Sequence, residues 1–211
     1  MIELVAFLGN PGREYSRNRH NAGFLLADRE PFYSSLSWQM KFKGLYAVSK
    51  TVSNTGAAVI HFIKPGTFMN LSGRAVSEVA SFFKIKTENI LVVHDELELP
   101  LGTISLKFSG GLGGHNGLRS MKACFGNADF WRLRIGIGRP DNRLPGEGGP
   151  PGSGRGIADW VLTNFGEDEL EILNLVLETS AELLSKVLSC EPNSLLPQWA
   201  KKKVEHDIKN S

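Results

Sequence analysis

The sequence predicts an α/β domain of three layers, in which a mixed β-sheet lies between helices. Short apolar runs typical of buried strands alternate along the chain with amphipathic segments typical of helices. A hairpin pattern in the first half requires antiparallel strands, whereas the strand-helix-strand pattern after it favours parallel ones. Because 211 residues, 41% of them hydrophobic, suffice for one well-filled core, we expect residues 1–211 to form a single domain.

The first third of the chain contains three expected strands. Residues 2–8 are largely apolar, as in a strand buried on both faces, and they end at an Asn-Pro-Gly turn. Helical spacing over residues 21–36 is only partial, because Pro31 interrupts any helix there. Residues 45–52 and 57–63 flank a Ser-Asn-Thr-Gly stretch and are rich in β-forming residues, which predicts a hairpin.

Helices and strands alternate through the rest of the chain. Residues 72–83 place apolar side chains on one helical face, with Ser72 expected as the cap. The clearest helical spacing covers residues 167–188, with acidic residues in the first turns, where the helix dipole favours them. Residues 139–156 hold six glycines and four prolines, which predicts a loop. The remaining expected elements are strands over residues 90–93, 103–108 and 131–137 and a helix over residues 118–125.

The bulk composition narrows the function only slightly. A net charge of +2 is far from the excess of a protein that binds nucleic acid by charge alone, so any anionic partner must meet a local patch. Cys124 and Cys190 are too few for a disulfide framework and lack the spacing of a zinc site. No apolar run approaches the roughly 20 residues that span a bilayer, and no leader pattern is evident. We therefore expect a cytoplasmic protein without a membrane partner.

Seven polar side chains follow strands or begin helices in this pattern: Asn10, His20, Asn70, His94, Asp95, His115 and Asn116. Because ligands of open α/β sheets bind beyond the carboxyl ends of strands, we expect these side chains to share one crevice. A histidine oriented by a carboxylate suits a general base, and amides suit binding of substrate or of an oxyanion. No Gly-x-Ser-x-Gly turn supplies a nucleophile. The expected chemistry therefore uses water directly.

Each of these residues also has a structural explanation. An isolated histidine is more often a hydrogen-bonded structural residue than a base, and Asp and Asn at such positions commonly form turns or caps. The glycine-rich run before His115 fits neither the dinucleotide nor the Walker pattern, so no nucleotide cofactor is expected. Basic residues near the same turns form either a solvated face or a clamp for a phosphate backbone. They are Arg13, Arg17, Arg19, Lys64, Lys107, Arg119, Lys122, Arg132 and Arg134.

With these residues placed, the chain resembles the bacterial-type peptidyl-tRNA hydrolase family, whose members cleave the ester joining a peptide to the 3′ end of tRNA. The resemblance extends over about residues 2–165, in the family's order. Its blocks are Gly9-Asn10-Pro11-Gly12 with Tyr15, Arg19-His20-Asn21-Ala22-Gly23, residues 64–73 (Lys-Pro-Gly-Thr-Phe-Met-Asn-Leu-Ser-Gly), residues 93–100 (Val-His-Asp-Glu-Leu-Glu-Leu-Pro), residues 113–118 (Gly-Gly-His-Asn-Gly-Leu) and residues 132–138 (Arg-Leu-Arg-Ile-Gly-Ile-Gly).

The resemblance implies a role for each matching position. His20 is similar to the family's general base, Asp95 to the carboxylate that orients it, and Asn10 to the residue that senses an acylated amine. The other implied site residues are Tyr15, Phe68, Asn70 and Asn116 in the groove for the peptide and the 3′ nucleotide, and Lys107 and Arg134 as tRNA-binding residues. Asn116 is also a candidate to hold the water or the oxyanion. The implied fold is a twisted mixed sheet flanked by helices. The resemblance also implies that the protein is a monomer and uses no metal or cofactor.

The resemblance leaves two points open. Residues 145–156 form a longer Gly/Pro-rich segment than the family usually has, which affects how this loop is expected to meet the groove or the acceptor stem. Two alternatives to an esterase that recycles stalled tRNAs remain: a non-catalytic RNA-binding scaffold of the same fold, and an esterase for small molecules. Binding alone does not require the complete set of His20, Asp95, Asn10 and Asn116, and a small-molecule esterase does not explain the many basic positions.

Overall fold

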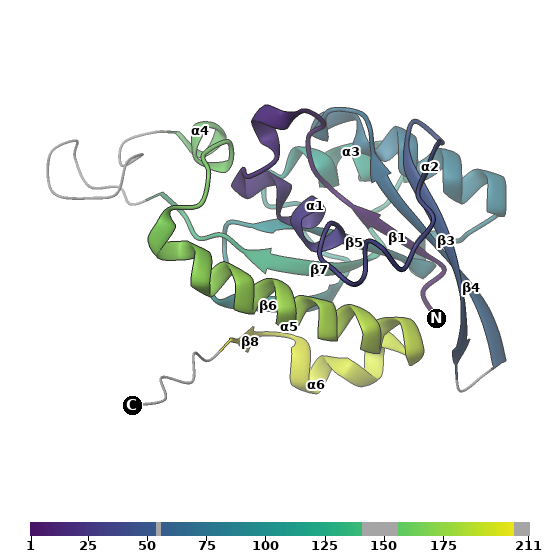
Figure 1. Ribbon diagram of the computed structural model, residues 1–211. Coiled ribbons are helices and arrows are strands. Elements are labelled where there is room, and N and C mark those ends of the chain that lie inside the picture. The colour runs from purple at the N-terminus through teal and green to yellow at the C-terminus, as the bar shows by residue number, and fades with distance from the viewer. Residues whose placement is uncertain (54–55, 141–155, 205–211) are drawn as a thin grey trace, which may run out of the picture.

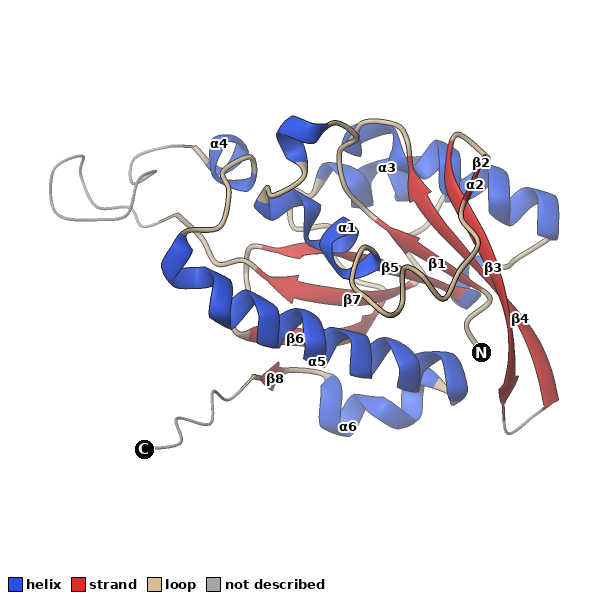
Figure 2. Cartoon of the chain, viewed as in Figure 1, coloured by secondary structure: helices blue, strands red, loops and turns tan. Residues whose placement is uncertain are grey.

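The computed structural model describes residues 1–53, 56–140 and 156–204, and its strands form one mixed sheet with helices on both faces (Figures 1 and 2). The sheet order is β2-β3-β4-β1-β5-β7-β6-β8. The predicted α/β class, with a mixed sheet flanked by helices, is confirmed. The strands are β1 Leu4–Phe7, β2 Gln39–Lys41, β3 Gly44–Ser53, β4 Gly56–Pro65, β5 Ile90–Glu96, β6 Thr103–Phe108, β7 Trp131–Gly136 and β8 Lys202–Lys203.

Helices cover the sheet in two layers. The α-helices are α1 Ala22–Ala27, α2 Ser72–Phe83, α3 Asn116–Phe125, α4 Ile157–Val161, α5 Leu170–Ser189 and α6 Leu196–Trp199. Helices α2 and α3 lie on one face and α1 and α5 on the other, where α5 crosses the sheet (Figure 1). No helix in the described ranges is long and apolar enough to span a bilayer.

Strand β1 explains why the site lies where it does. Its side chains alternate between the two cores, with Leu4 and Ala6 on the α2 and α3 side and Val5 and Phe7 on the α1 and α5 side. It pairs in parallel with both β4 and β5. The carboxyl ends of β1 and β5 therefore meet at one edge of the sheet, where ligands of open α/β sheets bind.

The pairing of strands confirms the expected hairpin and parallel units. Strand β3 pairs antiparallel with β4 over the whole length of both strands, and β5 pairs in parallel with β7. The expected helix over residues 167–188 is confirmed as the 3₁₀ turn Glu167–Glu169 followed by α5. The prediction that Ser72 caps α2 is wrong: Leu71 is the N-cap, and the Ser72 hydroxyl contacts Met69 Sδ at 4.0 Å instead.

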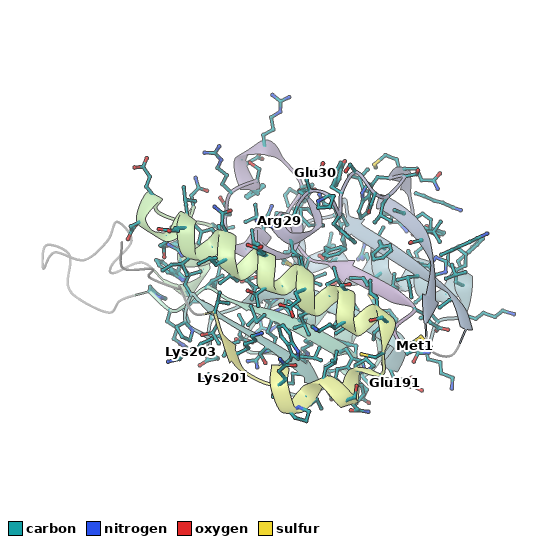
Figure 3. The ribbon with its side chains drawn as sticks, turned by 60° about the horizontal axis from the view of Figure 1, so that its bottom comes forward. Met1, Arg29, Glu30, Glu191, Lys201 and Lys203 are labelled. Carbon is teal, nitrogen blue, oxygen red and sulfur yellow. The ribbon has the colours of Figure 1, made fainter. Side chains whose placement is uncertain are left out.

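The lysine-rich segment near the end of the chain partly joins the sheet. Lys202 and Lys203 form β8, which pairs antiparallel with β6 and covers its edge. Lys201 and Lys203 keep exposed side chains (Figure 3). At the other terminus Met1 lies beside Glu191, whose carboxylate is 3.3 Å from the N-terminal ammonium (Figure 3). Most of the expected loop over residues 139–156 lies outside the described residues.

Gly23, in the first turn of α1, allows this helix to approach the strand ends closely. A Cβ atom there would lie 2.5 Å from the Leu8 carbonyl oxygen and 2.6 Å from that of Val93. The added methyl group would overlap these two backbone carbonyl groups, which cannot move without disturbing β1 and β5. We therefore expect Gly23→Ala to lower the free energy of unfolding by roughly 3 kcal/mol. Denaturant unfolding measures this effect. Gly111→Ala, where the Cβ meets open space, is the control, and equal stability of the two variants would contradict the close approach.

Candidate active site

Two adjoining cavities form a groove beyond the ends of β1 and β5. We call the first, of about 350 Å³, the Asp95 lobe and the second, of about 430 Å³, the Asn10 lobe. The Asp95 lobe is lined by residues 95–97, 112–116, 119, 157, 158 and 161 and by His20, and the Asn10 lobe by residues 10, 20, 68–70, 116, 158, 161 and 162. His20, Asn116 and helix α4 line both lobes, so His20 lies where they meet.

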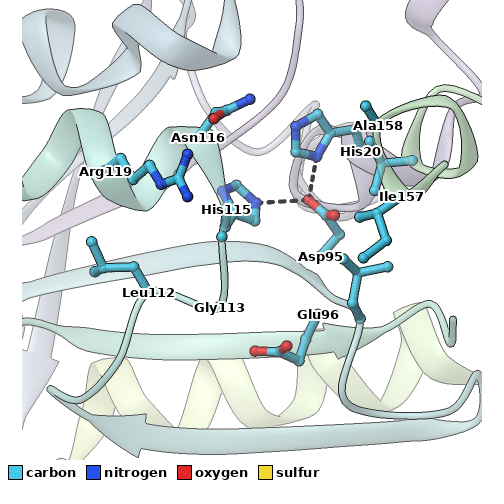
Figure 4. Close-up of a pocket in the computed structure, with 13 residues that line it drawn as sticks. His20, Asp95, Glu96, Leu112, Gly113, His115, Asn116, Arg119, Ile157 and Ala158 are labelled. Carbon is cyan, nitrogen blue, oxygen red and sulfur yellow. Dashed lines mark hydrogen bonds and ion pairs between the residues drawn. The ribbon is translucent and has the colours of Figure 1, made fainter.

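Asp95 accepts hydrogen bonds from two imidazoles at the base of this groove. Its Oδ1 lies 2.9 Å from Nδ1 of His20 and 2.9 Å from Nε2 of His115 (Figure 4). Strand β5 is buried as far as Asp95, whose side chain is almost fully shielded from solvent. The predicted convergence of His20 and Asp95 is therefore present. The structure also gives a partner to His115, a candidate residue for which no role was predicted.

The start of helix α3 fixes the tautomer of His115. As the N-cap of this helix, His115 accepts at Nδ1 from the backbone N–H groups of Gly117 and Leu118, at 3.0 and 3.3 Å. Nδ1 therefore carries no proton, and Nε2–H must be the donor to Asp95. One feature of the sequence is consistent with an N-cap role, because the histidine follows a glycine run and precedes a helix. Asparagine, serine and threonine, however, are the usual caps.

His20 presents the opposite ring nitrogen to the groove. Its Nδ1–H donates to Asp95, and Nε2 has no hydrogen-bond partner among the described residues. A carboxylate on one ring nitrogen fixes the tautomer and makes the other a stronger base. The geometry therefore gives His20 a free lone pair at the junction of the two lobes.

The pKa shifts of Asp95 and His20 agree with an ionised Asp95 beside a basic His20. Burial alone raises the pKa of Asp95, but the His20 and His115 imidazoles lower it well below its ordinary value, so the carboxylate stays ionised. Burial lowers the pKa of His20, but the charge and the hydrogen bond of Asp95 outweigh burial, and the net shift is upward. His20 is thereby a stronger base than a free imidazole.

His94 is adjacent in sequence but takes no direct part in the groove. It is fully buried, its Nδ1–H donates to the Asp95 carbonyl oxygen at 2.7 Å, and its ring meets that of His115 edge-on. Burial and the neighbouring His115 lower its pKa well below the ordinary value, so the ring is neutral. His94 thus supports the backbone and the His115 ring from behind.

His20, Asp95 and His115 also have the composition of a metal site, with ligand atoms within 4.8 Å of one another. A metal on Nε2 of His115 would move the ring proton to Nδ1. That proton would then face the N–H groups of Gly117 and Leu118, which already donate to Nδ1. The donor set therefore fits a hydrogen-bonded relay and does not fit a metal centre.

Asn10 is held so that its amide nitrogen remains free. Its Oδ1 accepts from the Met69 N–H at 2.8 Å, and its backbone N–H and C=O are both bonded to the Asn21 side chain. Nδ2 of Asn10 has no partner among the described residues. Because Asn10 lines the second lobe, it supplies a hydrogen-bond donor there.

The other predicted groove residues lie on the same lobes or beside them. Asn116, the first residue of α3, lines both lobes, whereas Asn70 and Phe68 line only the Asn10 lobe. Tyr15 packs edge-on against Phe68, with ring centroids 6.3 Å apart. Phe68 is 55% exposed, so an apolar surface is available at the mouth of the Asn10 lobe.

Lys107 and Arg134, the predicted tRNA-binding residues, line neither lobe. Lys107 is exposed on β6. Arg134 donates from Nε to Glu96 at 2.9 Å and from Nη1 to Ser105 at 3.3 Å, in a part-buried ion pair.

Not all of the basic residues near these turns reach the surface. Arg19, Lys64 and Arg132 are buried. Lys64 pairs with Asp28, and Arg132 donates to the backbone carbonyl groups of the glycine run before His115. The prediction that the whole set forms a solvated face or one phosphate clamp is wrong for these three residues.

The chain is similar to known proteins over most of its length. Residues 4–207 match the family model described as peptidyl-tRNA hydrolase. The chain is 44% identical to the peptidyl-tRNA hydrolase of Desulfitobacterium hafniense, over 84% of this chain and 88% of that protein, and 39% identical to that of Lactobacillus johnsonii, over 87% and 91%. A crystal structure of a variant peptidyl-tRNA hydrolase from Acinetobacter baumannii superimposes with a TM-score of 0.77 at 30% identity, over 97% of each chain.

Proposed function

The chain belongs to the peptidyl-tRNA hydrolase family and hydrolyses peptidyl-tRNA, and we propose that it does so with His20 as general base and water as nucleophile. The observation that carries this proposal is the pair of hydrogen bonds that Asp95 Oδ1 accepts, one from His20 and one from His115. This arrangement leaves Nε2 of His20 unprotonated, with no hydrogen-bond partner in the part of the chain that the structure describes. A scaffold that only binds RNA has no need of such an arrangement.

The proposed reaction begins with a water molecule hydrogen-bonded to Nε2 of His20. As the water oxygen attacks the ester carbonyl carbon, its proton moves to Nε2, and Asp95 stabilises the imidazolium that forms. The tetrahedral intermediate carries its negative charge on the former carbonyl oxygen, for which the Asn116 amide is the candidate donor. Its collapse breaks the bond to the ribose oxygen, which takes the proton from His20, and peptide and tRNA leave.

Asn10 suits the recognition of a blocked amine. A peptide or acetyl group on the α-nitrogen offers a carbonyl oxygen that accepts a hydrogen bond from Nδ2 of Asn10. A free α-ammonium has only N–H donors, which cannot pair with the Nδ2–H donor. Because a polar group left unpaired costs about 1–3 kcal/mol, this one contact discriminates by roughly 10- to 100-fold. Free aminoacyl-tRNA is thereby spared.

Asn10→Asp replaces this donor with an acceptor while keeping an oxygen for the Met69 N–H. We expect the ratio of kcat/KM for N-acetyl-aminoacyl-tRNA to that for aminoacyl-tRNA to fall by roughly 10- to 100-fold. Both substrates are measured side by side, with Asn127→Asp on a remote turn as the control. An unchanged ratio would show that Asn10 does not sense the amine.

The surroundings of the groove agree with a tRNA substrate. We propose that Tyr15, Phe68 and Asn70 contact the acyl group or the terminal nucleotide, and that Lys107 and Arg134 contact phosphates, through positioning contacts of the kind that carry no sequence information. We further propose that the protein acts as a monomer in the cytoplasm without metal or nucleotide cofactor.

The decisive test is incubation of the purified protein with N-acetyl-aminoacyl-tRNA. The proposal predicts release of the acylated amino acid and of intact tRNA at a rate that depends on the protein concentration. Binding of this substrate without deacylation would support the non-catalytic scaffold. Cleavage of simple esters with no preference for the tRNA substrate would support the small-molecule esterase.

A further inference from the structure

We propose that Arg19 is a positioning residue that holds helix α4, the wall shared by both lobes, against the segment that carries His20. The inference rests on the proposed function and assigns a substrate-binding role to a side chain that does not touch the groove. Arg19 is only 4% exposed and lies immediately before His20.

Arg19 contacts the α4 region with every part of its guanidinium group. Nη1 and Nη2 donate to the two carboxylate oxygens of Glu169 at 3.0 and 2.6 Å, and Nε donates to Thr163 Oγ1 at 3.1 Å. The group also stacks on Trp160, 3.9 Å from the ring centroid, and lies 4.8 Å from that of Phe165. A planar fork that is bidentate and stacked at once is a geometry that arginine provides and lysine does not.

Helix α4 depends on such contacts because it has only five residues, Ile157–Val161. A helix of this length is not stable on its own. Trp160 fixes helix α4 through two contacts. Its ring stacks on Arg19, and its Nε1–H donates to the Gly138 carbonyl at 2.9 Å. On the same helix Ala158 and Val161 line both lobes. Without the Arg19 side chain, the segment after α4 keeps its backbone bond from Arg19 N–H to the Thr163 carbonyl, at 3.0 Å, and the bridge between Asn18 and Asn164, but the wall formed by α4 itself is held less firmly.

The base itself is held by other bonds. His20 donates to Asp95, and the backbone after it is fixed by the bonds between Asn21 and Asn10. None of these bonds involves the Arg19 side chain. Loss of the guanidinium contacts should therefore weaken substrate binding more than it slows the chemical step.

The test compares Arg19→Lys, Glu169→Gln and the double variant with the wild type, using N-acetyl-aminoacyl-tRNA. We expect each variant to raise KM by about tenfold while kcat stays within about threefold. Because both residues belong to one ion pair, the double variant should be no worse than either single one. Hydrogen exchange of the backbone over residues 157–165 should accelerate, whereas exchange in β5 should not.

A matched control is Glu182→Gln, which breaks an exposed ion pair with Lys186 on α5 (3.5 Å) and should leave KM, kcat and exchange unchanged. Equal KM in the wild type, Arg19→Lys and Glu169→Gln would overturn the proposal. So would a fall in kcat, at unchanged KM, that matches the loss of folded protein in each variant. A wild type that fails to cleave the substrate would instead overturn the proposed function. The exchange measurement would then still report whether Arg19 holds α4.

Discussion

Replacing His20 with alanine should lower kcat for cleavage of N-acetyl-aminoacyl-tRNA by about 10³-fold. The substitution removes the only atom that we assign to proton transfer, Nε2, at the junction of the two lobes. His115, the other imidazole that lines the Asp95 lobe, cannot substitute for it, since it donates at Nε2 and accepts two backbone bonds at Nδ1. Single-turnover deacylation measures the loss.

The fold and the affinity for tRNA should remain nearly intact in His20→Ala. Within the described ranges the removed ring makes one hydrogen bond, to Asp95, and Asp95 keeps its bond to His115. A matched control is His61→Gln, because His61 pairs with Leu4 at the opposite end of β1 and should not affect the rate. Retention of wild-type activity in His20→Ala would show that another group activates the water.

Asp95→Asn should lower kcat/KM by about 10²-fold while preserving the geometry of the site. Because both histidines donate to the same oxygen, Oδ1, an asparagine oxygen at that position accepts both bonds. What the substitution removes is the negative charge to which we assign the stabilisation of the His20 imidazolium in the transition state. The loss is therefore electrostatic, and it should appear without a change in tRNA affinity.

The measurement for Asp95→Asn is steady-state kinetics with the acylated substrate, together with tRNA binding. Asp129→Asn is the matched control, since this exposed aspartate lies outside both lobes and accepts a hydrogen bond from Ser109. A rate within twofold of the wild type would show that the charge of Asp95 does not assist the base.

The parts of this fold that the sequence predicted are those whose residue pattern is set by burial. Strand β1 is apolar throughout because both of its faces are covered, and α5 shows helical spacing because one of its faces lies on the core. The hairpin of β3 and β4 was evident from its turn residues. In each case the local pattern and the tertiary environment agree.

The missed elements have no such pattern. Strand β2 is three exposed residues, β8 is two lysines and α4 has five residues. Their conformations depend on contacts with distant parts of the chain, such as the pairing of β8 with β6. Short elements of this kind carry too few residues for a period to be detected.

The site shows the same division. His20 and Asp95 could be predicted because each stands at the end of a strand or the start of a helix, although 75 residues separate them. The role of His115 could not be predicted, because it requires the N-terminus of α3 to face Asp95. Likewise, Arg19 is one of several basic residues in the sequence, and its burial against Trp160 and Glu169 distinguishes it.

The pH dependence of kcat/KM in the wild type and in Asp95→Asn tests the central claim most directly. Because we propose the unprotonated form of His20 as the active one, activity should rise with pH through the pKa of this residue, which the Asp95 carboxylate holds above its ordinary 6.5. Removal of the charge lowers that pKa, so the acid limb of the Asp95→Asn profile should move to lower pH even though the maximal rate falls. An acid limb at the same pH in both proteins would contradict the account.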